Sequence, residues 1–298
     1  MLKRFFPSKL ISRIAVAPRP ALPDRAGLAI VLVVRNEARH IAEWADFHRR
    51  AGVAHIYTYD DGSTDGTPDI LRETLGDQVT ITPWHQRLRD ADQGMEVHNQ
   101  VLAYAHAVSN YGPRHRWMAP IDADEFLIPT RANSVDAALA PLTDCPAISL
   151  PWHNFGRNGH DAPPEGGVLA NYTKRAARPL SGVRGVTNFK TIFDPARIRA
   201  LHVHSVETDL GRDVFNDAGA RFALRDRTTP AFYSTDAIQL NHYYTRSEQE
   251  LAAKIARGSN KSVEADKHAR RVRRNVANIE AEQVTDTAAQ SFLARIAP

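Results

Sequence analysis

The segment Trp117-Met-Ala-Pro-Ile-Asp-Ala-Asp-Glu-Phe-Leu127 decides the fold expected for this chain. Residues 116–121 form an apolar run that predicts a strand, and Asp122 and Asp124 follow where this strand leaves the sheet. Two carboxylates on one short turn can share a divalent cation, because hard cations prefer oxygen ligands. Such a cation can in turn hold a diphosphate. A solvated turn with capping acids is the alternative interpretation of these two aspartates.

A second segment, Tyr57-Thr-Tyr-Asp-Asp-Gly-Ser-Thr-Asp-Gly-Thr67, repeats the pattern of an apolar strand that ends in acids. Thr67 and Pro68 after it are typical of a helix cap and first helical position. The sequence of Asp60 to Ser63 is also a good turn that needs no function. Adjacent acids at a buried strand end are nevertheless costly without partners. A ribose diol or a pyrimidine N–H would satisfy Asp60 and Asp61, so the two segments predict a nucleotide-binding crevice beside a metal.

The first half of the chain alternates predicted strands with predicted helices. Apolar runs predict strands over 28–34, 53–59, 79–82 and 116–121. Helical patterns separate them over 39–52, 67–76 and 95–109. This alternation predicts an α/β fold with a central, mostly parallel sheet flanked by helices, in which ligands bind beyond the carboxyl ends of the strands. The polar residues expected at those ends are Asn36, Asp60, Asp61, Asp122 and Asp124.

The second half of the chain is less regular. Strands are predicted over 145–152, 189–193 and 200–206, long loops over 153–188, and helix over 247–279. Residues 211–235 show no clear period. We expect one compact unit with a leader over 1–27, a main domain over 28–258, and a C-terminal helical extension over 259–298 packed on the same unit.

The composition permits a well-packed enzyme and argues against several other classes. The chain has 298 residues, of which 43% are hydrophobic. Its single cysteine, Cys145, excludes a disulfide framework and a thiolate metal cluster, and it favours a reducing, cytoplasmic compartment. A net charge of only +4 and the lack of an aromatic–basic repeat argue against nucleic-acid binding.

The N-terminal segment, Met1-Leu-Lys-Arg-Phe-Phe-Pro-Ser-Lys-Leu-Ile-Ser-Arg13, mixes cations with apolar residues. It lacks the apolar core and cleavage site of a signal peptide, and no stretch of the chain approaches the roughly 18 apolar residues of a membrane span. Two interpretations remain open. The segment is either a plain leader or a peripheral contact with the anionic inner face of a membrane.

The order of these motifs resembles the GT-A glycosyltransferases, and most of all their family 2 and family 92 branches. The resemblance begins with Asn36-Glu37 and Glu43-Trp44, continues through the acids at 60–65, and includes Asp122-Ala-Asp124. Later segments that are similar to the family 92-like bacterial members are Trp152-His-Asn-Phe-Gly-Arg-Asn-Gly-His160, Asn241-His-Tyr-Tyr-Thr-Arg-Ser247 and Lys254-Ile-Ala-Arg-Gly258. The resemblance, which spans about 28–258, implies a GT-A-like fold. It also implies metal-dependent transfer of a sugar from a nucleotide-diphosphate donor to a saccharide or glycan acceptor.

The resemblance also implies roles for individual positions in the donor site. Asp60 and Asp61 would face the base and ribose of the donor, and Asn36 and Glu37 would line the same pocket. Asp122 and Asp124 would hold Mn²⁺ or Mg²⁺ against the donor diphosphate.

Three further donor-site positions lie late in the chain. His242 would be a third contact to the metal or the diphosphate, although a histidine beside aromatic residues is also typical of a packed core. Arg246 and Lys254, with Arg257, form a cationic cluster suited to a diphosphate, or else a solvated helix face.

The catalytic base is not assigned by the motifs. Family 2 members usually supply it from a Glu-Asp pair, and the second half of this chain has none. His160, Asp161 and Glu165 are candidates by position. We favour Asp161, because a carboxylate beside a glycine-flexed loop can close over the acceptor in an inverting transfer.

Two other enzyme classes compete with this interpretation. A sugar nucleotidylyltransferase shares the sheet and the metal, but it usually has a glycine-rich loop where this chain has Arg35-Asn36-Glu37-Ala38. A metal hydrolase could be built on His202 and His204, whose spacing on a strand would place both rings on one face. A third ligand for it is not evident, and a packing or acceptor-site role is the alternative for this pair.

Overall fold

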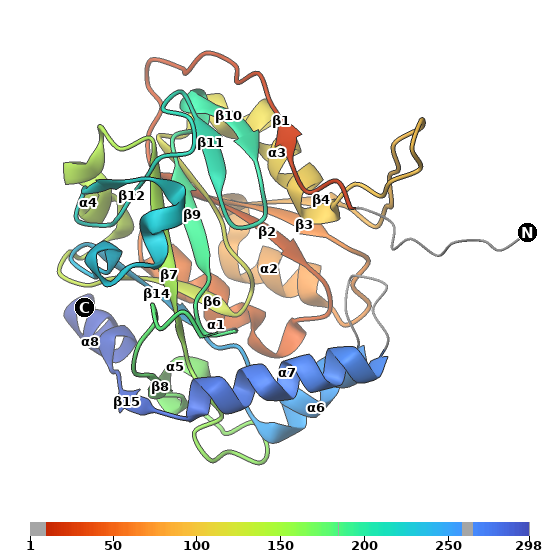
Figure 1. The fold of residues 1–298 in the computed structure, drawn as a ribbon, viewed down its shortest axis with the longest axis vertical. Helices are drawn as coiled ribbons and strands as arrows, with labels where there is room; N and C mark the ends of the chain where they lie inside the picture. The colour runs from red at the N-terminus through yellow and green to blue at the C-terminus, as the bar shows by residue number, and fades with distance from the viewer. Residues whose placement is uncertain (1–9, 184, 258–264, 298) are drawn as a thin grey trace, which may run out of the picture.

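The computed structural model describes residues 10–183, 185–257 and 265–297, and a ten-stranded sheet forms its centre (Figure 1). Its strands are β2 (Leu28–Val34), β3 (His55–Asp60), β4 (Val79–Pro83), β5 (Trp117–Pro120), β6 (Glu125–Pro129), β7 (Ala147–Asn154), β9 (Phe189–Phe193), β12 (Val214–Phe215), β13 (Arg221–Phe222) and β14 (Ile238–His242). They follow the order β13-β12-β7-β9-β5-β2-β3-β4, and β14 pairs with both β6 and β7.

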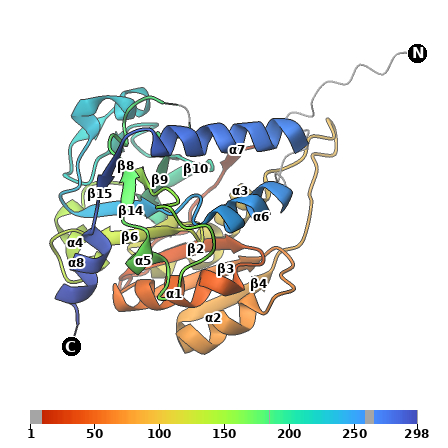
Figure 2. The same cartoon turned by 90° about the horizontal axis from the view of Figure 1, so that it is seen from below.

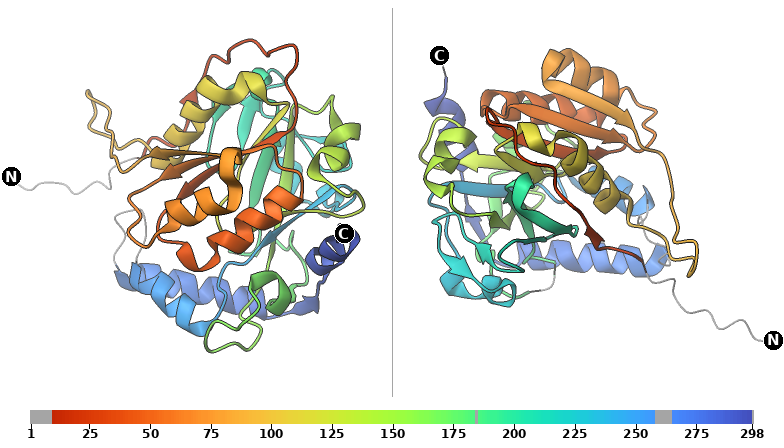
Figure 3. Two further views of the ribbon diagram at one scale, coloured as in Figure 1. Left: turned by 180° about the vertical axis from the view of Figure 1, so that it is seen from behind. Right: turned by 90° about the horizontal axis from the view of Figure 1, so that it is seen from above.

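The residues of β2 alternate between the two faces of the sheet, as the period of a strand requires. Leu28, Ile30 and Leu32 belong to a core shared with α1 (Ala38–Arg50) and α2 (Thr67–Leu75). Ala29 and Val31 belong to a second core shared with α3 (Asn99–Tyr111). Helices therefore cover both faces of this half of the sheet (Figure 3), which explains why β2 reads as a continuous apolar run.

The sheet is mixed rather than mostly parallel, which corrects the sequence-based expectation. β2 is parallel to β3 and to β5, so the predicted neighbourhood of the strands near 28–34, 54–59 and 116–121 is confirmed. However, β9 runs antiparallel to both β5 and β7, and β14 runs antiparallel to β6. Since β14 is parallel to β7, the reversed strands here are β9, from the second half of the chain, and β6, which directly follows the turn of the two aspartates. Strand direction depends on long-range pairing that a local pattern does not specify.

The C-terminal elements pack against the rest of the molecule, and β15 forms a separate two-stranded sheet with β8. They are α6 (Glu248–Arg257), α7 (Ala265–Glu280), β15 (Gln283–Thr285) and α8 (Ala288–Arg295). Figure 2 shows α7 lying along one side of the molecule with α6 beside it, and Leu251 of α6 packs against Val272 and Val276 of α7. Phe292 of α8 joins the main core. No helix among the described residues is both long enough and apolar enough to cross a membrane.

Several boundaries differ from the sequence-based predictions. The second helix has Gly66, not Thr67, at its cap position, and the third begins at Asn99 rather than near Met95. The predicted loop over 153–188 contains α5 (Val168–Asn171) and β8 (Lys174–Ala176), the partner of β15. The helical stretch predicted over 247–279 comprises α6 and α7, with residues 258–264 outside the described residues. The remaining strands and α-helix of the described residues are β1 (Ile14–Ala15), β10 (Ile198–Leu201), β11 (Val206–Thr208) and α4 (Val135–Leu139).

Candidate active site

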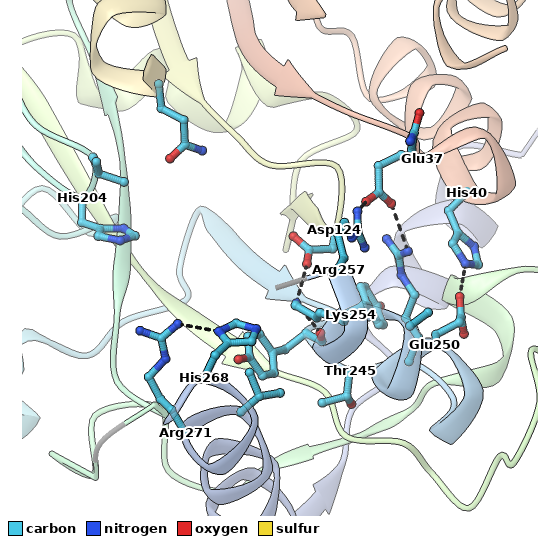
Figure 4. A pocket seen from close by; sticks show the side chains of 18 of the residues that line it. Glu37, His40, Asp124, His204, Thr245, Glu250, Lys254, Arg257, His268 and Arg271 are labelled. Atoms are coloured by element: carbon cyan, nitrogen blue, oxygen red, sulfur yellow. Dashed lines mark hydrogen bonds and ion pairs between the residues drawn. The ribbon is translucent and has the colours of Figure 1, made fainter. Parts of the chain in front are cut away.

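A pocket of about 870 Å³ lies between the carboxyl ends of the sheet strands and the C-terminal helices. Glu37 reaches it from the turn after β2, Asp124 from the turn after β5, and Lys254 from α6 (Figure 4). Arg246, from the segment after β14, and His204, from the turn between β10 and β11, also line it. The pocket thus gathers residues from both halves of the sequence at the edge where α/β sheets bind ligands.

Asp124 and His242 face each other beside this pocket. The Nε2 atom of His242 lies 3.6 Å from Oδ1 of Asp124. On the other side of the ring, Nδ1 lies 2.7 Å from Oδ1 of Asn154, whose Nδ2 donates to the Val186 carbonyl at 2.6 Å. Because an amide oxygen only accepts, Nδ1 of His242 carries the proton.

This pair of side chains suits a cation. Burial lowers the pKa of His242, so the ring is mainly neutral near pH 7 and its Nε2 holds a lone pair toward Asp124. Burial alone would raise the pKa of Asp124, but the positive charges of Lys254 and Arg246 lower it and hold the carboxyl ionised. A lone pair and a carboxylate repel each other unless a positive ion lies between them, and 3.6 Å is too long for a hydrogen bond. The Nδ1–H anchored on Asn154 is the usual arrangement of a metal-binding histidine.

Asp122 does not join this pair as expected. Its Oδ2 accepts from Nζ of Lys190 at 2.8 Å, and its Oδ1 accepts from Gln100 at 3.3 Å. Among the described residues, no group of three or more His, Cys, Asp or Glu side chains is arranged to hold a metal ion. The predicted set of Asp122, Asp124 and His242 is therefore reduced to two facing residues, and a cation there would take its other ligands from phosphate or water.

Lys190 was missed by the sequence-based reasoning. It lies on β9 with a fully buried side chain and contacts Glu125 as well as Asp122, with Nζ 3.4 Å from Oε2 of Glu125. Burial alone would lower the pKa of Lys190, but the two carboxylates raise it well above its usual value. A lysine inside the apolar stretch Phe189-Lys-Thr-Ile-Phe193 was the available signal, because a buried charge needs a partner.

The predicted cationic cluster lies at one end of the pocket. Glu37 accepts from Arg246 at 3.3 Å and from Arg257 at 3.2 Å. Nζ of Lys254 lies 3.5 Å from Oδ2 of Asp124 and donates to the Tyr244 carbonyl at 2.7 Å. Three cations thus surround Glu37 and Asp124, and their remaining donors are available to an anion in the pocket.

Asn36, Asp60 and Asp61 lie in two adjoining turns at the ends of β2 and β3. Asn36 has a left-handed backbone with φ of 55° and accepts from the Thr64 N–H at 2.8 Å, which ties the two turns together. Asp60 accepts from the Ser63 N–H at 3.2 Å. Asp61 is paired with Arg87 at 3.1 Å. Asn36 lines the large pocket, whereas neither Asp60 nor Asp61 does.

His160, Asp161 and Glu165 do not line the large pocket. His160 and Asp161 lie at a separate polar cavity of about 530 Å³. Their carbonyl oxygens accept from the N–H groups of Glu248 and Gln249 at the start of α6, at 3.0 and 2.9 Å. This segment therefore caps a helix, and the structure does not place the three predicted bases beside Asp124.

The strand predicted to carry His202 and His204 is interrupted, which corrects the basis of the metal-hydrolase alternative. The chain turns between β10 and β11, and the His202 N–H donates to the Ser205 carbonyl at 3.0 Å. Nε2 of His202 contacts Glu207 at 3.2 Å, whereas Nδ1 of His204 contacts the Phe189 carbonyl at 3.1 Å. The two rings have separate partners, and both residues line the large pocket.

Comparison with known sequences adds independent information. The model of glycosyltransferase family 92 matches residues 31–281. A family 92 protein of Oryza sativa subsp. japonica is 28% identical over 159 residues, which cover 51% of this chain and 25% of that protein. Another, of Ricinus communis, is 25% identical over 224 residues, which cover 72% of this chain and 35% of that protein. The chain therefore spans about a quarter to a third of the length of these plant relatives, and its expected bacterial character stays a prediction.

Among solved structures, the crystal structure of a mycobacterial protein is similar with a TM-score of 0.38 and 15% identity, covering 76% of this chain and 70% of that one. The family model extends from the middle of β2 to the residue after α7, and so includes Glu37, Asp124, Lys190, His242 and Lys254. The chain belongs to glycosyltransferase family 92.

Proposed function

We propose that this chain transfers a sugar from a nucleotide-diphosphate donor to a hydroxyl group of a saccharide or glycan, with Mn²⁺ or Mg²⁺ held by Asp124 and His242. The observation that carries the proposal is the 3.6 Å contact between Oδ1 of Asp124 and Nε2 of His242, whose Nδ1 is held by Asn154. Family membership supports glycosyl transfer in general. The mixed sheet is compatible with the GT-A-like arrangement that we also propose.

Different residues around this pair would bind different parts of the donor. Bound at this pair, a divalent cation would neutralise the diphosphate and make it a better leaving group. Arg246 and Arg257 would bind the phosphate oxygens through guanidinium N–H groups that Glu37 now orients. Asp60 and Asp61 would meet the nucleoside at the neighbouring turn, with Asn36 between them and the pocket.

The partners and location are proposed from composition and charge. We propose a cytoplasmic location and no nucleic-acid partner. Peripheral membrane contact would use the basic and apolar N-terminal segment, of which residues 1–9 lie outside the described residues.

Thermal stabilisation by candidate donors tests the proposal. Wild-type protein is heated with UDP-glucose, UDP-galactose or GDP-mannose, with Mn²⁺ or with EDTA. A donor present at about 100 times its dissociation constant should stabilise the fold by roughly 2.7 kcal/mol. With Mn²⁺, we expect one class of donor to give this gain in stability. The gain should be lost in EDTA and in the Asp124→Asn variant. The control variant Asp69→Asn, which changes an exposed pair with Arg72, should keep it. Equal melting temperatures with and without every donor would contradict the proposal.

A further inference from the structure

The large pocket has two chemically different ends. Glu37, Arg257 and Lys254 lie at one end, and His204 lies on the opposite side of Asp124 from them (Figure 4). The pocket is also lined by His202 and Ser205, which belong to the same turn as His204, and by Gln100, which donates to Asp122 at 3.3 Å. The Arg271 guanidinium lies on the same side of Asp124 as His204 in Figure 4, but none of the four side chains of Gln100, His202, His204 and Ser205 is a carboxylate, an ammonium or a guanidinium. They offer hydrogen-bond donors and acceptors of the kind that bind a polyhydroxyl ligand.

His204 is held rigidly at this end. Its backbone carbonyl accepts from Nη1 of Arg227 at 2.8 Å. Its Nδ1 faces the Phe189 carbonyl at 3.1 Å and therefore carries the ring proton. Burial lowers the pKa of His204 to about 4, with a further contribution from Lys190, so the ring is neutral near pH 7.

The second nitrogen of this ring has a weak partner. Nε2 of His204 lies 3.4 Å from Nδ2 of Asn188, which is longer than a normal N–H···N or N–H···O contact. An incoming hydroxyl group can therefore replace or join this contact at small cost.

Trp152 contacts both His204 and His242, the proposed cation ligand. The indole centroid lies 5.6 Å from the His204 ring and 4.1 Å from the His242 ring. A single shared aromatic neighbour thus brings His204 close to the proposed cation site. An inverting transfer needs a base in this neighbourhood, on the side of the sugar opposite the leaving diphosphate.

We infer that the end of the pocket lined by His204 binds the acceptor saccharide, and that Nε2 of His204 takes the proton of the attacking hydroxyl. This inference rests on the proposed sugar transfer. The acceptor oxygen forms a bond to the anomeric carbon while the bond from that carbon to the diphosphate breaks. The electron pair leaves with the nucleoside diphosphate, and the proton passes from His204 to solvent. The anomeric configuration is inverted, and the base comes from the β10–β11 turn instead of from Asp161.

The test compares His204→Gln with Asp161→Asn and with His55→Gln as a matched control. His55 lies at the amino end of β3, where its Nε2 contacts Thr80 at 2.8 Å, and it does not line the pocket. The probes are the three donors named above with Mn²⁺, and a mixture of methyl hexosides and N-acetylhexosamines as acceptors. Donor dissociation constants are measured by calorimetry and transfer by product chromatography.

Loss of the correct base should lower the transfer rate by about 10²–10⁴-fold. We expect this loss in His204→Gln, with the donor dissociation constant changed by less than about two-fold, and near wild-type rates in the other two variants. If wild-type protein transfers sugar and His204→Gln does so equally fast, or if the product retains the anomeric configuration, the inference is wrong and the proposed function stands. If wild-type protein binds none of these donors, both are wrong.

Discussion

The ammonium group of Lys190 lies 2.8 Å from Oδ2 of Asp122, whereas Asp124, two residues later, faces His242. Glu125, which is also fully buried, completes this ion cluster and accepts from the Asp122 N–H at 2.8 Å. The two aspartates of the motif therefore have different partners. Asp122 is paired with the buried Lys190, whereas Asp124 faces Nε2 of His242 on one oxygen and Lys254 on the other.

The first prediction concerns stability. Lys190→Met removes the positive charge between Asp122 and Glu125 and leaves these two carboxyl groups without their shared cation. Breaking a buried ion pair in this way typically costs about 3–5 kcal/mol. Urea denaturation should show a loss of this order. The exposed Lys174→Met serves as the control, and we expect a change below about 0.5 kcal/mol there. Equal stability of the two variants would show that Lys190 is not a required partner.

The second prediction is that Asp124, and not Asp122, binds the metal ion. Asp124→Asn and His242→Gln should abolish Mn²⁺ binding in the presence of UDP, whereas Asp122→Asn should retain most of it. Asn154→Ala should weaken Mn²⁺ by about 10–100-fold, because it removes the acceptor that orients His242. Titration calorimetry and the electron paramagnetic resonance of Mn²⁺ measure both effects. If Asp122→Asn loses as much Mn²⁺ binding as Asp124→Asn does, the two aspartates do not have these different roles.

The positions of the strand ends in the first half of the chain could be predicted from the sequence, because each end is marked by an apolar run followed by polar residues. The apolar run over 28–34 and the acids after 53–59 and 116–121 predicted parallel strands whose carboxyl ends meet, and the pairing of β2 with β3 and β5 agrees. Boundaries were less precise. Gly66 rather than Thr67 occupies the second helix cap because its left-handed φ of 83° suits glycine.

The arrangement of side chains in the second half of the chain depends on long-range contacts, which no local sequence pattern shows. His202 and His204 have the spacing of a strand, but the backbone turns between β10 and β11 and gives the two rings different partners. The pairing of Lys190 with Asp122 joins positions 68 residues apart. The backbone carbonyl groups of His160 and Asp161 accept hydrogen bonds from the start of α6. Both residues therefore lie at a different cavity from the one that Asp124 lines.

The third prediction concerns the nucleoside end of the donor site. Asp61 is mostly buried, with 13% of its side chain exposed, and is paired with Arg87. Asp61→Ala should weaken UDP or GDP binding at least ten-fold, while the melting temperature changes little. Asp69→Ala, which breaks the exposed pair with Arg72, is the control and should leave binding unchanged. Calorimetric dissociation constants decide the matter. An unaltered value for Asp61→Ala would place the nucleoside elsewhere.

The fourth prediction concerns the diphosphate. Arg246 can direct several N–H groups at once, and lysine at this position keeps the charge but loses the planar fork. A hydrogen bond to a charged group contributes about 1.5–3 kcal/mol. Arg246→Lys should therefore weaken UDP binding by roughly ten-fold or more. The exposed Arg178→Lys, at the pair with Glu282, should have no effect. If UDP binds equally well to Arg246→Lys, this guanidinium does not contact the diphosphate.

The fifth prediction concerns acid stability and Glu250. Burial alone would raise the pKa of Glu250, but hydrogen bonds from His40 and from Ser247, whose Oγ lies 2.6 Å away, lower it to about 2. An unfolded glutamate has a pKa of about 4.3. Because the folded pKa is the lower one, the carboxylate stabilises the fold fully above about pH 4.3, and this contribution is lost as the pH falls toward 2.

The comparison of wild-type protein with Glu250→Gln measures this contribution. At pH 7 the variant should be less stable by up to roughly 3 kcal/mol, since each pKa unit corresponds to about 1.4 kcal/mol. The gap between the two proteins should narrow steadily below about pH 4 in urea titrations. Glu73→Gln, at an exposed position of α2, should track the wild type at every pH. A gap for Glu250→Gln that stays constant down to pH 2.5 would mean that the hydrogen bonds to Glu250 do not depend on its charge.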